Sequence, residues 1–310
     1  MHASVSAATL TRSQVTKLHD LAGLQRSSVT GKEILTADSE WVRLSECVKV
    51  LERFDCSTRC RQNGHVTFLR SVELKPGAPN SDAGHPFDVP AIMAMAEREL
   101  VLRLDPAVTV FVSDNGSGKS TLLEAIAVSQ GMNAEGGARG MQFQTRSDTV
   151  STLHEHLRVL RSPRPPNDMF FLRAESYFNV ATAIENYGEP SLKLYGGSPH
   201  ARSHGESFID LIVHRFGPNS VFVLDEPEAA LSVHGQLQLL VRMHDLIAEG
   251  CQFVISTHSP LLMAYPDATL YDFTASGPAK AEWPDVDTVR ITADFLANPR
   301  GFLSELLDED

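Results

Sequence analysis

The segment from Ser113 to Thr121 has the residue types and spacing of a phosphate-binding loop. It follows the apolar run Val108–Val112 and leads into an amphipathic segment that starts at Lys119. A buried strand, a glycine-rich turn and a helix in this order direct backbone N–H groups at anionic oxygens. In such a turn Lys119 reaches the terminal phosphates of a nucleotide and the Ser120 hydroxyl binds Mg²⁺. The candidate nucleotide-binding residues are Asn115, Gly116, Ser117, Gly118, Lys119, Ser120 and Thr121.

Two carboxylates follow the apolar run Val221–Leu224. Ligands of open α/β sheets bind at the carboxyl ends of the strands, where Asp225 and Glu226 would lie. We expect Asp225 to hold Mg²⁺, directly or through water, and Glu226 to act as the general base on an attacking water. The alternative is an ordinary exit from strand to turn, which the spacing after Lys119 disfavours.

Two further polar segments are candidates for contact with a γ-phosphate. His258 follows the apolar run Gln252–Ser256 and could donate a hydrogen bond to the phosphate or to the attacking water. The second segment, Ser203-His204-Gly205-Glu206-Ser207, precedes a predicted helix and is called here the signature segment. It forms a second anion-binding device at a helix start, unless Ser203 or Ser207 only caps that helix.

Short apolar strands alternate with helical segments in the part of the chain that must position these residues. This pattern predicts an α/β fold with a mainly parallel sheet covered on both faces. The expected strands are Val66–Leu74, Leu100–Leu104, Val108–Val112, Met169–Arg173, Val221–Leu224 and Gln252–Ser256. The expected helices are Leu153–Arg161, Tyr177–Glu185, Glu206–Phe216 and Leu231–Ile247. The expected loops are Pro76–Pro90, a mobile Gly131–Gly140 and Gly196–Gly205.

Residues 1–64 differ from the rest, being polar and rich in Ser and Thr. Helical patterns occur near Ser13–Leu24 and Ser39–Phe54, so this part is either a small appended element or a loosely ordered extension. Cys56, Cys60 and His65 match no common zinc spacing and lack a fourth ligand.

Composition restricts the setting of the protein. The 310 residues contain no apolar run long enough to span a membrane and no secretory signal pattern. Four cysteines do not suggest a disulfide scaffold, so a reduced, cytoplasmic setting is expected. A net charge of −12 argues against broad binding to DNA phosphates. Arg158, Arg161 and Arg164 form either a local basic stripe or, as we favour, a solvated helix end followed by a stiff connector.

The order of these motifs resembles the ABC-type ATPases, and more closely the soluble AAA/ABC-type ATPases related to the SMC and DNA-repair branch. The resemblance covers roughly residues 65–300. It implies a P-loop NTPase domain over 65–310, with an N-terminal antiparallel β subdomain and a helical signature subdomain at about 145–215. It also implies ATP and Mg²⁺ as ligands, ATP hydrolysis, and a homodimer in which Ser203, Gly205 and Glu206 contact the γ-phosphate of the other subunit. Glu228–Ser232 would join the two sites.

Several residues depart from the pattern of that family. Ser113 stands where the phosphate loop usually opens with Gly, and Glu206 replaces the second Gly of the transporter signature. The usual Mg²⁺-sensing Gln is not evident, so Glu175 is assigned that role, with Gln142 and Gln144 as alternatives. Phe87 is the candidate for the aromatic residue that stacks on adenine, but a position in the core is favoured for it. The segment between Lys119 and the signature segment is too short for a coiled coil.

Other functions stay open at this point. The chain could be the nucleotide-binding subunit of an ABC transporter, although the missing Gln and the altered signature disfavour this. It could also be a switch module with negligible turnover, which the pair Glu226 and His258 disfavours. The partner is an unidentified protein or DNA. The acidic C-terminus is interpreted as a solvated helix end and not as the metal cluster of a nuclease; its residues are Glu305, Asp308, Glu309 and Asp310.

Overall fold

The computed structural model describes residues 66–141, 151–188 and 204–307, together with residues 192, 195, 197, 198 and 200. The chain divides into two units, Met1–Cys56 and Ser57–Asp310, and every described residue belongs to the second. The domain division at residue 64 stays a prediction. The predictions that lie outside the described residues concern the helical patterns of residues 1–64, Cys56, Cys60, His65, Gln142, Gln144, Ser203 and the last three acidic residues.

A seven-stranded sheet positions the candidate catalytic residues. Its strands lie in the order β10 (Gly277–Ala281), β9 (Thr269–Thr274), β3 (Val108–Val112), β8 (Gln252–Ser256), β7 (Val221–Asp225), β6 (Met169–Arg173) and β4 (Gly137–Ala138). The five inner strands run parallel, while β10 and β4 pair antiparallel at the two edges. The predicted mainly parallel α/β sheet is therefore confirmed.

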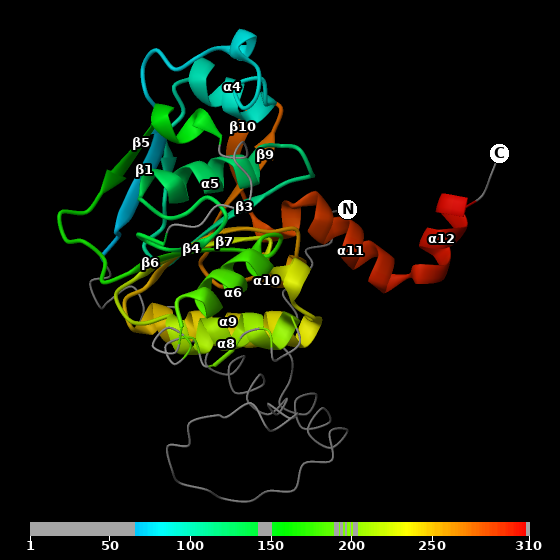
Figure 1. Cartoon of the computed structure of the whole chain (residues 1–310). Coiled ribbons are helices and arrows are strands. Elements are labelled where there is room, and N and C mark those ends of the chain that lie inside the picture. Colours follow the sequence, from blue (N-terminus) through cyan, green and yellow to red (C-terminus); the bar gives the residue numbers. More distant parts are fainter. Residues whose placement is uncertain are drawn as a thin grey trace, which may run out of the picture. The chain divides into compact units, whose positions relative to one another are not determined.

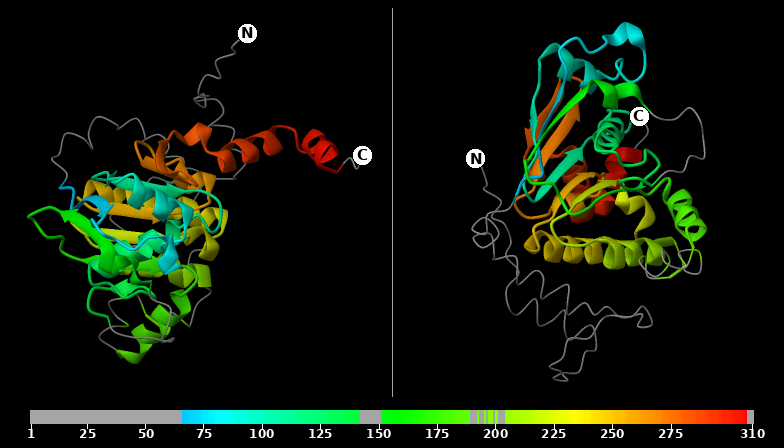
Figure 2. Two further views of the ribbon diagram at one scale, coloured as in Figure 1. Left: turned by 90° about the horizontal axis from the view of Figure 1, so that it is seen from above. Right: turned by 60° about the vertical axis from the view of Figure 1, so that its left-hand side comes forward.

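Helices cover both faces of this sheet, as Figures 1 and 2 show. The helix α5 (Lys119–Ser129) lies on one face, and α8 (His204–Arg215) and α9 (Val233–Ala248) lie on the other. Every residue of β7 is buried. Val221 and Val223 join the core under α5, whereas Phe222 and Leu224 join the core under α8 and α9. A strand enclosed in this way needs apolar side chains in both directions, which explains its continuous apolar run.

The remaining helices are shorter or lie at the periphery of the sheets. The loop predicted over Pro76–Pro90 ends in a helix, and Pro90 occupies its first turn, where proline is well tolerated. The described residues contain no helix with the length and apolar character needed to cross a bilayer. The other helical elements are η2 (Ser81–Ala83), α4 (Pro90–Glu97), η3 (Thr152–His156), α6 (Tyr177–Asn186), η5 (Pro227–Ala230), α10 (Pro260–Met263), η6 (Trp283–Asp285), α11 (Asp287–Ala297) and α12 (Pro299–Leu307).

A small antiparallel sheet has the strand order β2 (Leu102–Arg103), β1 (Leu69–Leu74) and β5 (Leu157–Arg161). The buried Gln252 side chain ties this sheet to the start of β8. Its Oε1 accepts from the Leu69 N–H at 2.9 Å and its Nε2 donates to the Leu69 carbonyl at 2.8 Å. The expected antiparallel β subdomain is present, and a buried amide that satisfies the Leu69 backbone fixes it to the main sheet.

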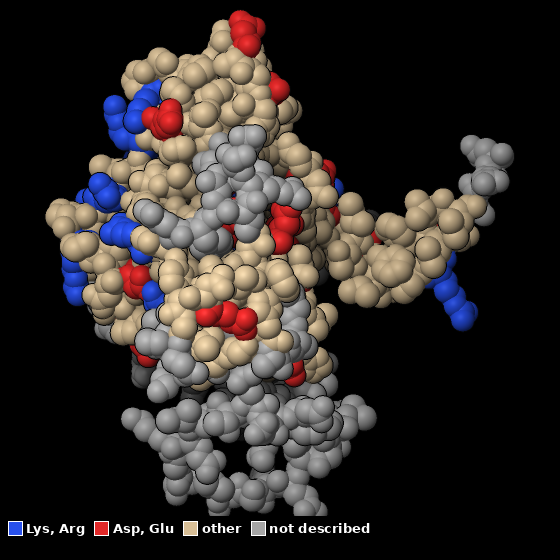
Figure 3. Space-filling view, in the orientation of Figure 1, with Lys and Arg blue, Asp and Glu red and all other residues tan. Residues whose placement is uncertain are grey.

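The prediction of a helix over Leu153–Arg161 is wrong. This segment forms the short turn η3 and then β5, which pairs along the length of β1. The spacing of Leu153 and Leu157 imitates a helical face, but pairing with β1 overrides it. Arg158 and Arg161 thus lie on an exposed strand and not at a helix end. Figure 3 shows Lys and Arg side chains gathered over this side of the molecule.

The segment Gly131–Gly140 differs from the loop predicted for it. Gly137–Ala138 form β4, which pairs antiparallel with Phe170 and Phe171 of β6 and closes one edge of the main sheet. A two-residue strand between glycines carries no periodic signal, so its pairing could not be read from the sequence. The elements between Thr152 and Arg173 are η3, β5 and β6, so within the described residues the predicted helical subdomain is α-helical only from Tyr177 on.

Candidate functional site

The phosphate loop joins β3 to α5, as predicted. Gly116 and Gly118 have φ values of +78° and +99°, which residues with a side chain rarely adopt. Within the described chain, no backbone N–H from Asn115 to Gly118 donates to another group of the protein. Helix α5 begins at Lys119, so its positive end faces the same loop. Free donors and a helix start fit a bound phosphate chain.

Ser113, the departure from the usual glycine, fits the loop without backbone strain. It is absent from the described residues with positive φ, so this position does not require glycine. The Ser113 and Ser117 hydroxyls share a hydrogen bond across the loop, and the Ser113 hydroxyl lies 3.1 Å from the Asp114 carbonyl oxygen. A serine here therefore links the two ends of the loop.

The two glycines of the loop provide a matched pair of variants. A Cβ at Gly118 would lie 2.8 Å from Val89 Cγ1, whereas a Cβ at Gly116 would meet nothing within 4 Å. We expect Gly118→Ala to weaken binding of a fluorescent ATP analogue by about tenfold or more, because clash adds to a strain of about 1–3 kcal/mol. Gly116→Ala introduces only the strain of a positive φ, without a clash, and should therefore lose less affinity for the analogue. Equal losses in the two titrations would contradict a role for the Val89 contact.

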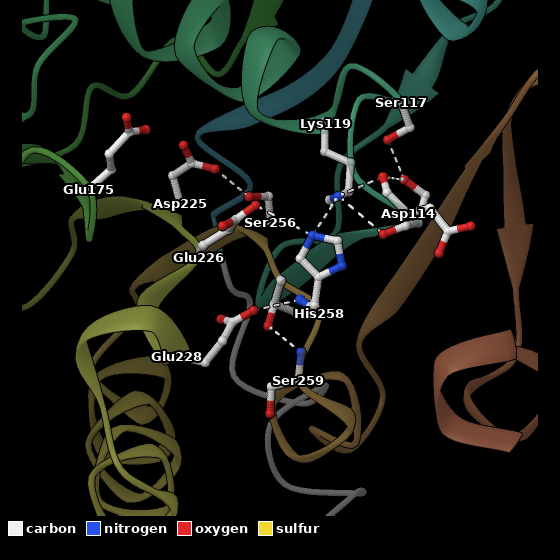
Figure 4. A network of polar contacts seen from close by, with 12 residues as sticks. Asp114, Ser117, Lys119, Glu175, Asp225, Glu226, Glu228, Ser256, His258 and Ser259 are labelled. Atoms are coloured by element: carbon white, nitrogen blue, oxygen red, sulfur yellow. Dashed lines mark hydrogen bonds and ion pairs between the residues drawn. The ribbon is translucent and has the colours of Figure 1, made fainter. Parts of the chain in front are cut away.

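Lys119 is buried at the centre of a polar network, which Figure 4 shows. Its Nζ lies 3.1 Å from the Ser113 carbonyl oxygen, 3.2 Å from the Asp114 carbonyl oxygen and 3.0 Å from His258 Nε2. Burial lowers the pKa of Lys119, and the nearby carboxylates, with Glu226 the strongest of them, partly oppose this shift. The ammonium group is therefore desolvated and held at the mouth of the phosphate loop.

Asp225 ends β7 at the carboxyl edge of the sheet, as predicted. Its Oδ1 accepts a hydrogen bond from the Ser256 hydroxyl on β8, and its Oδ2 lies 3.2 Å from Arg173 Nε on β6. Both partners are aligned with Asp225 in the register of the parallel strands. The sheet itself thus fixes the position of this carboxylate.

Glu226 turns out of the strand in a left-handed conformation, with φ +47° and ψ +51°. Such a conformation costs energy for a residue other than glycine and occurs most often at functional sites. Its N–H donates to the Ser256 carbonyl at 2.9 Å, and its Oε1 lies 3.4 Å from His258 Nε2. The turn directs the carboxylate toward the histidine.

His258 connects the lysine and the carboxylates, because its Nε2 lies near both Lys119 Nζ and Glu226 Oε1. The backbone N–H of His258 donates to Glu228 Oε1, which holds the loop after β8 against η5. Ser259 then caps α10, its hydroxyl accepting from the Leu261 N–H at 3.2 Å. The structure thus brings together four predicted site residues, namely Lys119, Asp225, Glu226 and His258.

The predicted magnesium ligands divide into two groups. Ser120 is the second residue of α5, next to Lys119, and Asp225 lies in the network, whereas the Glu175 side chain is 90% exposed. Figure 4 shows Glu175 on the far side of Asp225 from Lys119. Among the described residues, no group of three or more His, Cys, Asp or Glu is placed to hold a metal ion. Ser120 and Asp225 fit Mg²⁺ only together with phosphate oxygens and water, which is the usual mode for this ion.

The described part of the signature segment lies apart from this network. Gly205 and Glu206 are in the first turn of α8, which covers the sheet face opposite α5. A Cβ at Gly205 would lie 3.1 Å from the Ala230 carbonyl oxygen, so this residue contacts η5. Ser207 is inside α8, which begins at His204, so the alternative that Ser207 caps the helix is wrong.

Arg173 and Glu124 are site residues that the sequence interpretation missed. Arg173 Nη1 lies 2.7 Å from Glu124 Oε2, and both side chains are largely buried beside Asp225. The available signal was an arginine at the end of an apolar strand, aligned with the Asp225 strand. Phe87 is in the core, 5% exposed and in edge contact with His156, as favoured over an adenine-stacking role.

Residues 203–264 match the model of a family described as "AAA domain, putative AbiEii toxin, Type IV TA system". The match includes the signature segment, the Asp225–Glu226 pair and His258, and it confirms the resemblance to AAA/ABC-type ATPases. No curated protein matches the chain in sequence.

Two solved structures are similar to parts of this chain at low sequence identity. One is cbiO1 from Clostridium perfringens, part of the ABC transporter complex cbiONQ, at 17% identity and TM-score 0.43 over 76% of this chain and 99% of that chain. Another is the SMC head domain from Thermotoga maritima, at 14% identity and TM-score 0.35 over 69% of this chain and 98% of that chain. At this level of similarity neither bears on activity or partner.

Proposed function

We propose that this protein binds and hydrolyses ATP with Mg²⁺ as an ABC-type ATPase. The observation that supports this most directly is the network of Figure 4, in which Lys119, Glu226 and His258 converge from three separate segments. Asp225 adjoins them at the end of β7. A phosphate loop alone fits many nucleotide-binding proteins, but a base and a histidine facing it suit a hydrolase.

The residues have separate tasks in this reaction. Lys119 and the loop N–H groups would hold the β- and γ-phosphates, and Ser120 and Asp225 would hold the metal. Glu226 accepts a proton from the attacking water. The water oxygen bonds to the γ-phosphorus, and the bond between the γ-phosphorus and the bridging oxygen that stays with ADP breaks. His258 donates to a γ-phosphate oxygen or orients the water. Mg²⁺ held there would neutralise part of the negative charge on the phosphate chain.

We also infer that a second copy of the chain completes each site. Gly205 and Glu206 lie at the start of a helix on the sheet face opposite α5. They would therefore not face Lys119 of the same copy. A head-to-tail homodimer would place the signature segment of one copy, including Ser203, across the triphosphate from the phosphate loop of the other. ATP then favours the closed dimer, and loss of the γ-phosphate releases it. The cytoplasmic setting and an unidentified protein or DNA partner belong to the same proposal.

Mixed dimers test this arrangement. Lys119→Ala leaves the signature segment intact, and Ser203→Ala leaves the phosphate loop intact. Neither variant alone should release phosphate from ATP at an appreciable rate, whereas a mixture contains dimers with one site built from two unaltered halves. We expect the mixture to recover a substantial part of one site's activity. Wild-type activity in Ser203→Ala alone, or no recovery in the mixture, would contradict a shared site.

A further inference from the structure

Arg173 connects two carboxylates beneath the phosphate loop. Its Nη1 lies 2.7 Å from Glu124 Oε2 on α5, and its Nε lies 3.2 Å from Asp225 Oδ2 on β7. The side chains of Arg173, Glu124 and Asp225 are 19%, 9% and 6% exposed. Two carboxylates this far from solvent require a cation, because an unpaired buried charge is costly.

The two contacts of Arg173 are unequal in geometry. Nη1 makes hydrogen bonds to Glu124 and, at 3.3 Å, to the Ala134 carbonyl oxygen. Nε is buried and close to Asp225, yet it makes no aligned hydrogen bond. The guanidinium group is thus anchored on the side of Glu124, while its attraction to Asp225 depends on charge alone. The Asp225 oxygen is the partner that another cation can take over.

We propose that Arg173 is the countercation of Asp225 before Mg²⁺ binds, and that it thereby sets the Mg²⁺ concentration the site requires. The proposal rests on the proposed function, because Asp225 is the predicted metal ligand. Two cations cannot share one carboxylate oxygen without repulsion, so the guanidinium group lowers the affinity of the site for Mg²⁺. Glu175, whose side chain is exposed and whose Oε2 lies 3.9 Å from Arg173 Nη2, gives the displaced group another acceptor. Arg173 is in this view a positioning residue.

Arg173→Gln in the full chain tests the proposal. The readout is binding of a fluorescent, non-hydrolysable ATP analogue, titrated with Mg²⁺ at a fixed nucleotide concentration. We expect the Mg²⁺ midpoint to fall by about tenfold, the order expected when a competing cation leaves a partly buried carboxylate. Nucleotide affinity at saturating Mg²⁺ should change by less than about threefold, since Arg173 is not one of the phosphate-loop residues. An unchanged or higher midpoint would overturn the proposal.

Arg215→Gln is the matched control. Arg215 pairs with Asp168 just before the start of β6, and its side chain is 15% exposed, close to the value for Arg173. We expect this variant to lose stability, as Arg173→Gln does, but to keep the wild-type Mg²⁺ midpoint. A shift of the midpoint in Arg215→Gln as large as in Arg173→Gln would mean that destabilisation alone causes it, and would also overturn the proposal.

A second variant covers the case in which Arg173→Gln does not fold. The double substitution Arg173→Gln with Glu124→Gln removes one charge of each sign and should also lower the Mg²⁺ midpoint. A midpoint that does not fall in this double variant would overturn the inference. Wild-type protein that binds no analogue at any Mg²⁺ concentration would instead refute the proposed ATP site. Binding with a midpoint that Arg173→Gln leaves unchanged would refute only the role of Arg173.

Discussion

Glu226→Gln is expected to slow ATP hydrolysis by about two to four orders of magnitude, the usual contribution of a general base. Glutamine has the shape of glutamate but cannot take a proton from the attacking water. Nucleotide binding should survive, because Lys119 and the phosphate-loop glycines are unchanged. The measurements are phosphate release and the affinity for a fluorescent ATP analogue. In light scattering with ATP, this variant should also retain the dimer for longer than the wild type.

Glu228→Gln is the control for that result. Glu228 is another carboxylate of the same network, but its Oε1 accepts from the His258 backbone N–H. An amide oxygen can accept the same bond, so we expect a much smaller loss of turnover than in Glu226→Gln. Unchanged turnover in Glu226→Gln would exclude Glu226 as the base, and a larger loss in Glu228→Gln would transfer that role to Glu228.

Lys119→Met is expected to abolish nucleotide binding without harming the fold. Each charge-assisted hydrogen bond contributes about 1.5–3 kcal/mol, so losing the phosphate contacts of the ammonium group should weaken ATP binding by about a hundredfold or more. The substitution should also stabilise the folded protein, because burial lowers the pKa of Lys119 and thus disfavours its charged form. Urea unfolding should show that the free energy of unfolding is equal to or above the wild-type value.

The stability advantage of Lys119→Met should depend on pH in a definite direction. The ordinary pKa of lysine is 10.5 and the folded value lies below it, so the unfolded chain binds this proton more tightly. Wild-type stability therefore rises with pH in the window below 10.5, and the advantage of the methionine variant shrinks as the pH rises toward 10.5. An advantage that grows with pH, or an unchanged affinity for ATP, would contradict the assigned position of Lys119.

The strands that form continuous apolar runs could be predicted from the sequence. Val108–Val112 and Gln252–Ser256 have the predicted bounds, because a strand buried on both faces leaves an apolar run with polar residues at its end. The same reasoning placed Lys119, Asp225 and His258 at one sheet edge, and the structure brings them together. Their roles in catalysis remain predictions.

Other features depend on pairing over long distances in the chain. Leu157–Arg161 is a strand because β1 offers it a partner, and nothing in its own spacing excludes a helix. Gly137–Ala138 is a strand only through β6. Arg173 ends the predicted strand Met169–Arg173, but its two carboxylate partners come from distant segments of the chain. The sequence interpretation could not anticipate these partners.

The position of α8 on the face opposite α5 has a kinetic consequence. In the proposed arrangement a lone molecule carries both halves of a site but cannot bring them together, so turnover requires an encounter. In dilute solution the total rate would then grow with the square of the protein concentration and become linear only once most molecules are paired. Expression level alone would thus control this activity, because at low protein concentration most molecules would be monomers and would not hydrolyse ATP.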